Sequence, residues 1–534
     1  MTGKQLKIVG WGYEGDEISA EEHEMITTRF TERFEGDFEI REAPGEESIE
    51  LHAPRLEIPA ALAPFSSAAK RDRLVHTYGK SFPDYARAFE RDFSPAPDIV
   101  AFARSESDIE AVYDHAAGAN VAVIPFGGGT SVCGGVEPAV GGSYNGTISL
   151  DLTALDKVLE IDKTSRAARI QGGIRVPAME AQLKTHGLTM RHFPQSMELA
   201  TLGGMIATRS GGHFATLYTH IDDFVESLRT VTPAGTMESR RLPGSGAGPS
   251  PDRLMIGSEG ALGIITEAWM RLQDRPTFRG GTAVLFDDVY MGAEAVRTIC
   301  QAALYPANVR LLDAAEAYFN GFGDGTQSVV ILAFENNDHP VGPWLDRALE
   351  ICRDFGGGYD DDVARSGEGH RTGAAGAWRH AFIRMPYWKK TIVGMGIITD
   401  TFETAITWDR FPAFYQAVMA ATEEAAREVT GQPGSVSCRF THCYPDGPAP
   451  YFSFQAKGRH GALAEQWLAI KSKALDAVIA HGGTITHHHA VGRDHMPWYN
   501  RQRPSLFADA LAGAKGRLDP KGILNPGVLL PAPA

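Results

Sequence analysis

The chain has 534 residues and a net charge of −15, and 43% of its residues are hydrophobic and 22% charged. This length predicts two to four domains. The acidic balance argues against a non-specific nucleic-acid binder, which normally carries a basic surface. No stretch reaches about 18 uncharged apolar residues, and no apolar segment follows a basic N-terminus, so neither a transmembrane helix nor a secretory signal is expected.

Cysteines are few and scattered, and no pair has the CxxC spacing of a zinc site. Reduced thiols are therefore expected, as is usual in the cytosol. We expect a cytoplasmic protein, with contact to a membrane surface left open. The cysteines are Cys133, Cys300, Cys352, Cys438 and Cys443.

Residues 1–90 are acidic and interrupted by prolines, and an N-terminal extension with short helices is expected there. Residues 91–275 are expected to form one domain, in which a strand, a helix capped by Ser105 and a second strand lead into a glycine-rich turn. Further elements are then predicted in chain order. They are strands at 146–152, 157–162 and 167–174, a helix at 176–187, a hairpin within 228–242 and a strand at 263–272.

Residues 276–495 alternate strands and helices and are expected to form a second domain. A hairpin is predicted at 435–458, with Pro-Asp-Gly as its turn. A helix at 462–483 follows and leads to the three consecutive histidines of GGTITHHHAVGRD. Residues 496–534, with two proline-limited turns, are expected to return to the first domain.

Three loops rich in glycine, serine and threonine lie beside predicted strands. The first, PFGGGTS at 125–131, has neither the GxGxxG nor the GxxxxGK[ST] spacing of the common nucleotide loops. Glycines let backbone N–H groups converge on a pyrophosphate without steric cost, although a tight structural turn explains one such run equally well. The others span 194–212 and 255–267. Three such loops together indicate a long, flat ligand that is wrapped by backbone.

The order of these loops, PFGGGTS, then PQSMELAT with GG and ATRSGG, then GSEGALG, closely resembles the vanillyl-alcohol-oxidase/PCMH family. LDPKGILNPG, near the C-terminus, resembles that family's ending. The resemblance implies an α+β fold, with a PCMH-type FAD-binding domain and a cap domain built on an antiparallel sheet. Many members bind FAD covalently through a histidine just after the glycine run. Thr130 stands there in this chain, so non-covalent FAD is expected.

By this resemblance the first loop would hold the pyrophosphate, and the other two would flank the ribityl chain, the isoalloxazine ring and the adenosine. For Arg209 a structural role is the alternative. The residues expected to contact FAD are Pro125, Phe126, Gly127, Gly128, Gly129, Thr130, Ser131, Pro194, Ser196, Thr201, Gly204, Thr208, Arg209, Ser210, Gly257, Ser258, Glu259, Gly260, Leu262, Gly263 and Ile264.

Four further motifs look like those of the alkyldihydroxyacetonephosphate synthase branch of the family. They are VRLLDAAE, TDTFETAITWDR, SCRFTHCYPDGPAPYFSF and GGTITHHHAVGRD. Enzymes of that branch exchange the acyl group of acyl-dihydroxyacetone phosphate for a fatty alcohol without net redox change, and N5 of the flavin holds C1 of the substrate covalently in between. The resemblance implies this reaction here, a small-molecule or lipid substrate, and a homodimer.

Carried over residue by residue, the branch's pattern would place Tyr444 over the flavin, where it would assist proton transfer or departure of the carboxylate. His488 would be the general base or acid, supported by His487 and His489, because imidazole titrates near neutral pH.

The resemblance also implies a set of substrate contacts. Arg310 and Thr401 would bind the phosphate or the carbonyl region, and His192 would face the flavin. Upstream of Thr401, where the family carries an arginine, this chain has Lys389, a point charge without arginine's planar fork. A looser or differently oriented phosphate site is expected there, with Arg384 as an alternative cation.

The residues by themselves also allow simpler interpretations of these side chains. On a strand, His487 and His489 would share one face, and a metal ion would use both with a distant carboxylate. We expect no metal, because no Asp or Glu lies within three residues on either side of the histidines. The three histidines would otherwise have a structural role, Tyr444 would simply pack at its turn, and Arg310 would form a surface ion pair.

Two rival functions also remain open. The first is a true FAD-dependent oxidase or dehydrogenase of an alcohol, a hydroxy acid or a phenol, an interpretation that Lys389 favours. The second is a catalytically silent flavoprotein that acts as a scaffold. The apolar run at 385–399 would wall an alkyl tunnel and touch a membrane surface, or would form a buried strand of the cap.

Overall fold

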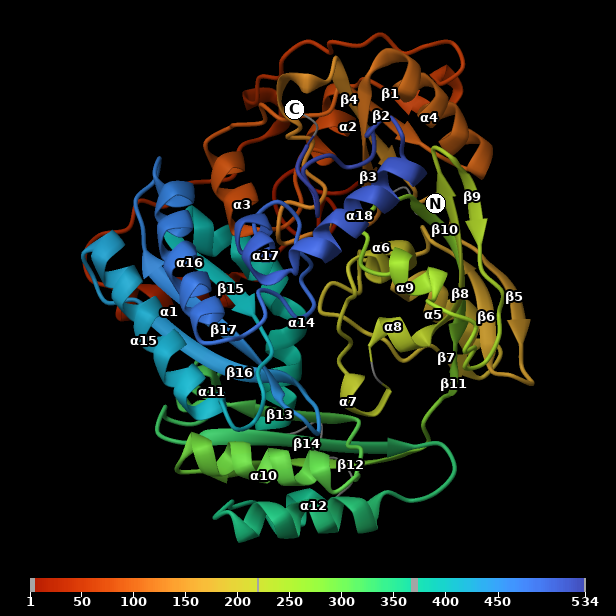
Figure 1. Ribbon diagram of the computed structural model, residues 1–534. Coiled ribbons are helices and arrows are strands. Elements are labelled where there is room, and N and C mark those ends of the chain that lie inside the picture. Colours follow the sequence, from red (N-terminus) through yellow and green to blue (C-terminus); the bar gives the residue numbers. More distant parts are fainter. Residues whose placement is uncertain (1–4, 219, 366–372, 533–534) are drawn as a thin grey trace.

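The computed structural model describes residues 5–218, 220–365 and 373–532. Three sheets of four, five and six strands, with the helices that cover them, make up most of the described molecule. In Figure 1 the small parallel sheet lies at the top, an antiparallel sheet at the right, and the largest sheet below and to the left. Within the described ranges, none of the helices combines the length and apolarity that crossing a bilayer requires.

The parallel sheet has the order β1-β2-β4-β3, with β1 antiparallel to β2 at one edge. Parallel strands need a crossover connection, which is usually a helix, and α4 is the crossover from β2 to β3, with β4 between them in the sheet. The Ser105 hydroxyl accepts a hydrogen bond from the backbone N–H of Asp108 at 3.2 Å, which confirms the predicted N-cap. These elements are β1 (Ser66–Ser67), β2 (Ile99–Phe102), α4 (Glu106–Ala119), β3 (Val121–Phe126) and β4 (Gly146–Asp151).

The second sheet is antiparallel, in the order β5-β6-β10-β8-β9. Its strands lie within a few residues of the predicted ones, and helices α5 and α6 pack on its apolar face. These elements are β5 (Val158–Asp162), β6 (Ala167–Gln171), α5 (Val176–Lys184), α6 (Leu202–Ala207), β8 (Val225–Thr232), β9 (Gly235–Glu238) and β10 (Ile264–Arg271).

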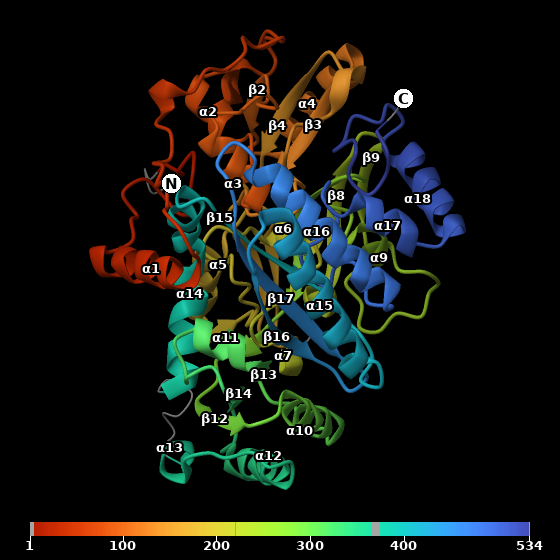
Figure 2. The same ribbon diagram turned by 90° about the vertical axis from the view of Figure 1, so that its left-hand side faces the viewer.

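The largest sheet is antiparallel, in the order β12-β14-β13-β16-β17-β15. Helices α10, α12, α15 and α16 cover its outer face and form the main hydrophobic core with it (Figure 2). These elements are β12 (Phe278–Phe286), α10 (Val289–Gln301), β13 (Asn308–Leu312), β14 (Ser328–Asn336), α12 (Gly342–Asp354), β15 (Ile397–Glu403), α15 (Phe411–Thr430), β16 (Ser435–Cys443), β17 (Pro448–Lys457) and α16 (Leu463–Ala480).

The remaining elements connect these sheets or cover their edges. They are α1 (Ala20–Arg33), η1 (Glu46–Ser48), η2 (Ala63–Phe65), α2 (Lys70–Val75), α3 (Phe82–Phe89), η3 (Gly141–Ser143), β7 (Leu188–Thr189), α7 (Ala215–Tyr218), α8 (Ile221–Phe224), α9 (Pro251–Met255), β11 (Gln273–Asp274), α11 (Ala314–Phe319), α13 (Asp361–Arg365), α14 (Gly373–Gly394), α17 (Met496–Gln502) and α18 (Ser505–Leu518).

The apolar run at 385–399 is helical up to the end of α14 and becomes strand only in β15. Trp388 and Ile392, four residues apart on one helix face, pack against Phe30 of α1. Arg384 binds the carboxylate of Glu22 in α1 through two hydrogen bonds of 2.8 and 2.6 Å. The N-terminal segment is thus fastened to the second half of the chain.

The last segment of the chain lies against the first two sheets. The backbone N–H of Ala234, in the turn between β8 and β9, donates to the carbonyl of Leu518 at the end of α18 at 3.1 Å. Beyond α18 the chain runs along β3. The backbone N–H of Val123 donates to the carbonyl of Ile523 at 2.8 Å, and the N–H of Asn525 donates to the carbonyl of Val123 at 2.9 Å. Residues 523–525 therefore extend the parallel sheet by a short stretch of chain.

Candidate active site

A cavity lies between the glycine-rich loops and the inner face of the largest sheet. Its walls include backbone from the loops at 125–131 and 194–212, and side chains from strands β13, β15, β16 and β17. Residues far apart in sequence therefore meet at one site.

The glycines of the first loop leave no room for side chains. A Cβ at Gly127 would lie 2.3 Å from Oγ1 of Thr201, and a Cβ at Gly128 would lie 2.1 Å from the carbonyl oxygen of Leu199. Gly260 has φ +72°, and a Cβ there would lie 2.5 Å from Cγ of Pro125. Because these glycines carry no side chains, the loop backbones lie close together along the cavity wall. This arrangement suits a pyrophosphate and a flat ring system. The residues present fit FAD.

Most of the residues predicted to contact FAD line this cavity. They are Pro125, Phe126, Gly127, Gly128, Gly129, Thr130, Ser131, Pro194, Ser196, Thr201, Gly204, Thr208, Ser210, Glu259, Gly260, Gly263 and Ile264. The other four, Arg209, Gly257, Ser258 and Leu262, lie outside its lining. The Arg209 side chain is 63% exposed and pairs with Asp222 at 2.7 Å, which agrees with the structural alternative for Arg209.

The strands of the large sheet direct alternate residues to the cavity and to the core, as the period of a strand requires. On β17, Tyr451 lines the cavity and Phe452 is fully buried in the core; on β13, Arg310 lines the cavity and Val309 and Leu311 are buried. Thr401 of β15 also faces the cavity. The predicted contacts Arg310 and Thr401 therefore belong to one wall.

Arg439 of β16 is a cavity residue that the sequence did not single out. Its guanidinium pairs with the buried carboxylate of Glu316 and lies 3.9 Å from the ring centroid of Tyr451. Arg310 lies near it, and burial, followed by the charge of Arg439, lowers the pKa of Arg310 to about 9. Two buried guanidinium groups on one wall make an electropositive surface, and an anion would offset their repulsion.

Of the two tyrosines in the SCRFTHCYPDGPAPYFSF motif, Tyr451 is the one that lines the cavity. Its hydroxyl forms a 2.9 Å hydrogen bond with Oγ1 of Thr401, and burial raises its pKa. Tyr444 lies behind the histidines instead, outside the cavity lining, and its hydroxyl bonds to Nε2 of His487 at 2.8 Å and to Nε2 of His220. The two tyrosines of the SCRFTHCYPDGPAPYFSF motif thus occupy different positions.

The three consecutive histidines lie in an irregular loop, not on a strand. The buried carboxylate of Glu403 accepts hydrogen bonds from the backbone N–H groups of all three, at 3.1 Å from His488 and 2.7 Å from His489. Although burial alone would raise it, the pKa of Glu403 is held below its ordinary value by His489 and His487. One distant carboxylate therefore sets the shape of the loop.

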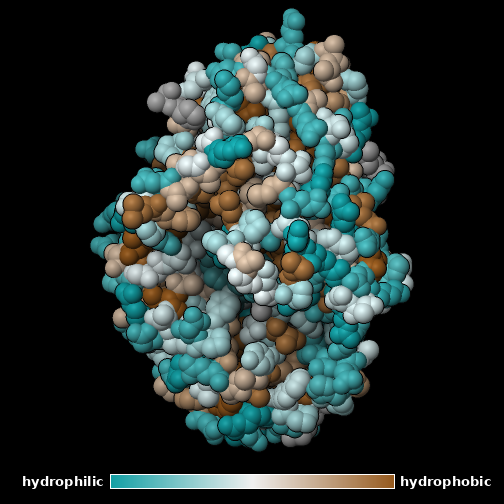
Figure 3. All heavy atoms as spheres, turned by 45° about the vertical axis from the view of Figure 1, so that its right-hand side comes forward, coloured by the Kyte–Doolittle hydropathy of each residue, from teal (hydrophilic) through white to brown (hydrophobic). Residues whose placement is uncertain are grey.

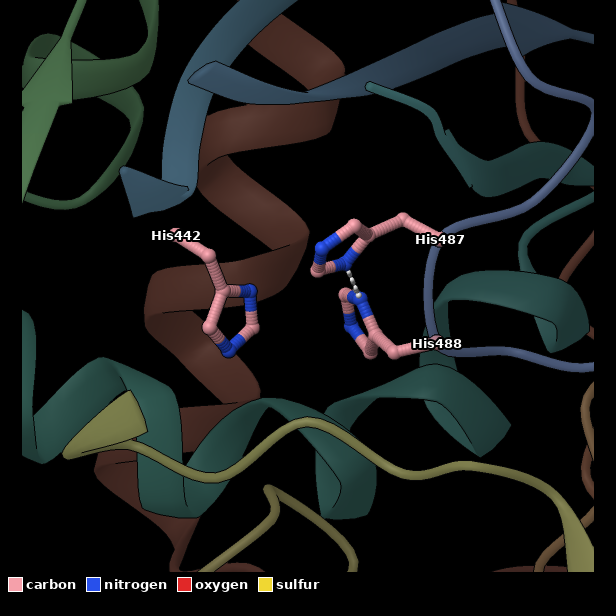
Figure 4. Close-up of side chains that lie close together, drawn as sticks. All are labelled: His442, His487 and His488. Carbon is pink, nitrogen blue, oxygen red and sulfur yellow. Dashed lines mark hydrogen bonds between the residues drawn. The ribbon is translucent and has the colours of Figure 1, made fainter. Parts of the chain in front are cut away.

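Within this loop, His488 and His489 line the cavity, whereas His487 is behind them. Figure 4 shows the rings of His487 and His488 in contact and the ring of His442, from the end of β16, facing both. Nδ1 of His487 and Nδ1 of His488 lie 2.9 Å apart. Burial lowers the pKa of both rings well below the ordinary value, and neighbouring imidazoles add to the shift. Both are therefore neutral near pH 7.

Lys389 lines the cavity, and its ammonium donates to the backbone carbonyl of Lys80 at 3.0 Å. Lys80 is a second cavity cation that sequence reasoning missed, and burial lowers its pKa to about 8. Arg384, the alternative cation, is outside the cavity lining and is engaged by Glu22. His192 is buried beside the cavity, where its Nε2 bonds to Oγ of Ser210 at 2.8 Å.

Comparisons with known proteins agree with this geometry. Residues 97–239 match the family described as FAD binding domain, and residues 275–529 match the C-terminal domain of FAD linked oxidases. The chain is 29% identical to the alkyldihydroxyacetonephosphate synthase of Dictyostelium discoideum, over 86% of this chain and 78% of that protein. It is 28% identical to that of Trypanosoma brucei brucei, over 94% and 86%. A solved structure of an alkyldihydroxyacetonephosphate synthase superposes with a TM-score of 0.78, at 24% identity and 98% coverage of both chains.

The matched domains and the glycine-lined cavity define a flavin-dependent enzyme with the FAD-binding and C-terminal domains of FAD-linked oxidases. The predictions of an α+β fold and of FAD as cofactor are confirmed, and Thr130 in place of a histidine agrees with non-covalent binding. Among such enzymes, the protein is of the alkyldihydroxyacetonephosphate synthase type, which it resembles over most of its length.

Proposed function

We propose that the protein exchanges the acyl group of acyl-dihydroxyacetone phosphate for a fatty alcohol and so makes the precursor of an ether lipid. The observation that carries this proposal is the composition of one cavity, in which buried arginines, a tyrosine–histidine pair and an apolar wall face a glycine cradle. The names of the similar synthases support the same reaction.

The substrate would be held at two ends. Arg310 and Arg439 would bind the phosphate, with Lys80 and Lys389 as further cations, because charge-assisted hydrogen bonds to phosphate are strong. An alkyl chain would lie along the apolar wall, where burial of each CH₂ contributes about 0.8 kcal/mol. That wall is formed by Trp11, Phe193, Phe382, Met385 and Ile392.

FAD, when bound, would supply an electrophilic N5 that holds C1 of the substrate between departure of the carboxylate and arrival of the alcohol. The bond from C1 to the acyl oxygen breaks, the carboxylate leaves with the electron pair, and a bond from C1 to the alcohol oxygen forms. The alcohol's proton is released, so one proton leaves per turnover. Tyr451 and His488 would move protons at C1 and at the alcohol oxygen, as a hydroxyl and a neutral imidazole can.

The visible spectrum of the purified protein, taken without oxygen or any other electron acceptor, tests this proposal. Adding acyl-dihydroxyacetone phosphate should bleach the yellow flavin band, and adding a fatty alcohol should restore it with formation of the ether product. Tyr451→Phe and His488→Ala should each slow the bleaching by about 100-fold or more. A spectrum that does not change would refute the exchange reaction.

Oxidation of an alcohol, a hydroxy acid or a phenol is the second candidate function. It is favoured by the match to FAD-linked oxidases and by Lys389 at the position where an arginine was expected. Consumption of oxygen, or bleaching of an acceptor dye, with a panel of such substrates would support it over the exchange of acyl for alkyl groups.

Assembly and location remain proposals from the sequence resemblance. We propose a cytoplasmic homodimer that contacts membranes peripherally. On the face drawn in Figure 3, apolar side chains lie in several small groups among hydrophilic ones. Analytical ultracentrifugation would measure the oligomeric state, and flotation with phosphatidylcholine vesicles would measure membrane binding.

A further inference from the structure

Behind the cavity, four side chains form one continuous hydrogen-bonded chain. Nδ1 of His488 and Nδ1 of His487 are 2.9 Å apart, and Nε2 of His487 lies 2.8 Å from the Tyr444 hydroxyl. The same hydroxyl contacts Nε2 of His220, whose ring is roughly parallel to that of Tyr444. The chain begins at a residue that lines the cavity and ends at a residue that is only half-buried.

We propose that His487, Tyr444 and His220 conduct a proton between His488 and the protein surface. The inference rests on the proposed function, because that reaction releases one proton per turnover inside the cavity. His220 and Tyr444 would thus be positioning residues that act through His487 and His488.

Each member has the donor and acceptor that conduction requires. A neutral imidazole has one N–H and one lone pair on its two nitrogens, and a phenol both donates and accepts. His488 takes a proton at Nε2 and gives the proton on Nδ1 to Nδ1 of His487. His487 gives the proton on Nε2 to the oxygen of Tyr444, which gives its own proton to Nε2 of His220. His220 releases the proton on Nδ1. One proton enters, one leaves, and no charge remains on the chain.

The surface end is suited to receive the proton. His220 immediately precedes α8, which begins with Ile221, Asp222 and Asp223. The Asp223 side chain is 48% exposed and pairs with Arg253 at 2.6 Å. A proton that reaches His220 therefore arrives near one carboxylate in contact with water, that of Asp223, whereas Asp222 is buried and paired with Arg209 and Arg253.

A metal ion is the competing use of the same nitrogens. One nitrogen from each of His442, His487 and His488 lies within 4.8 Å of the others. Two imidazole nitrogens on one tetrahedral zinc ion, with bonds of ~2.0–2.1 Å, are roughly 3.3 Å apart. The 2.9 Å separation of the two Nδ1 atoms is shorter and is that of a hydrogen bond. The geometry thus favours conduction of protons over coordination of an ion.

Tyr444→Phe breaks the chain at one atom and leaves the packing of the ring in place. With the FAD-loaded enzyme, kcat should fall by about tenfold or more and the solvent deuterium isotope effect on kcat should rise, with unchanged KM and FAD content. The control is Tyr78→Phe, since the Tyr78 hydroxyl donates only to the backbone carbonyl of Asp92 at 2.7 Å, away from the cavity. A Tyr444→Phe enzyme within about twofold of wild type in kcat would overturn the proposal.

His220→Ala opens the surface end of the chain to small bases. The loss in kcat should be recovered at least partly by added imidazole, and not by added benzene-like molecules of the same size that cannot carry a proton. Rescue separates conduction from a structural role, because a merely destabilised protein gains nothing from a soluble base. A loss in kcat that imidazole leaves unchanged would overturn the proposal.

Two measurements do not depend on the substrate. With ¹⁵N-labelled histidine, Tyr444→Phe should shift the ring nitrogen signals of both His220 and His487, whereas Tyr78→Phe should shift neither. If either signal stays in place, the hydroxyl does not link the rings and the proposal fails. A stoichiometric transition metal in the purified protein would also overturn it. If Tyr444→Phe shifts both histidine signals but the wild-type protein makes no ether product, the proposed function is refuted and the hydrogen-bonded chain is not.

Discussion

At the scale of single residues, the acid–base state of His488 gives a direct prediction for the pH profile. Burial, and then the charge of His489, lowers the pKa of His488. A lowered pKa keeps the imidazole unprotonated, and able to accept a proton, as the pH falls past the ordinary value of about 6.5. The acid limb of kcat/KM against pH should therefore lie below that value. An acid limb at or above it would contradict the role of His488 as the base.

Lys389 allows the phosphate end of the cavity to be tested with a matched neighbour. Lys389→Met should raise the KM for the phosphate-bearing substrate by roughly tenfold or more, because a hydrogen bond to a charged group contributes about 1.5–3 kcal/mol. The control is Lys390→Met, since Lys390 binds Glu17 at 2.9 Å outside this cavity. Equal KM values for the two variants would place the phosphate elsewhere, and FAD content should be unchanged in both.

The two tyrosines of one motif show what sequence reasoning could and could not give at this scale. The resemblance selected Tyr444, at the turn of the hairpin. The register of the hairpin places Tyr451 directly opposite Arg439, which lines the same cavity. Counting from the turn would have paired Tyr451 with Phe440 instead, because the register shifts by one residue between Phe440 and His442. The link from Tyr444 to His220 joins positions 224 residues apart and leaves no local signal.

At the scale of elements, the glycine loop after β3 can be tested by adding one methyl group. Gly128→Ala places a Cβ 2.1 Å from the carbonyl oxygen of Leu199, so the loop must move away from its partner. The purified variant should contain little or no FAD, measured from the ratio of visible to 280 nm absorbance. The control is Gly142→Ala, because a Cβ at Gly142 meets nothing within 4 Å. A fully yellow Gly128→Ala protein would show that this loop does not hold the cofactor.

The boundaries of helices and strands could be predicted where the local sequence carries a strong signal. They could not be predicted where a residue distant in sequence determines the backbone conformation. The Ser105 cap and the hairpin turn after Cys443 are local signals, and both elements lie where they were predicted. The sequence by itself also allows a strand at the three histidines. They lie in a loop instead, because their backbone N–H groups bind the carboxylate of Glu403, more than eighty residues away in sequence. Tertiary hydrogen bonds to a buried charge can override local pattern.

At the scale of the whole molecule, one buried ion pair joins the two halves of the chain. Arg191 follows β7 in the FAD-binding part, and its Nε donates at 2.6 Å to Glu335 of β14 in the large sheet. The two side chains are only 14% and 3% exposed. Glu335→Gln would leave the guanidinium unpaired, and removing one partner of a buried pair costs about 3–5 kcal/mol.

Urea denaturation should therefore show a lower free energy of unfolding for Glu335→Gln than for wild type. The control is Glu350→Gln, because the pair of Arg347 and Glu350 is more than half exposed and contributes about 1 kcal/mol or less. Equal decreases in the free energy of unfolding of the two variants would mean that the pair of Arg191 and Glu335 does not hold the two halves together. A first transition that precedes the loss of flavin absorbance would show the halves separating before the cofactor site unfolds.

The α+β fold and FAD as cofactor could be predicted from loop motifs spread along the chain. The cavity did not follow, since its walls are made by residues that the sequence separates by hundreds of positions. The alternation of side chains along a strand tells which residues share a face. Only the sheet order β13-β16-β17-β15 shows that four of them line one cavity, namely Arg310, Arg439, Tyr451 and Thr401.

The pairing of residues 523–525 with β3 bears on when the cofactor can bind during synthesis of the protein. Asn525 donates through its side-chain amide to the carbonyls of Gly135 at 3.1 Å and Glu259 at 2.8 Å, and so ties together loops on the cavity wall. The ribosome adds Asn525 390 residues after Gly135, a delay of roughly 20–80 s at about 5–20 residues per second. During that interval the nascent chain has an incomplete cradle. We expect the flavin to be captured only after residues 523–525 have been made and have closed the loops around it.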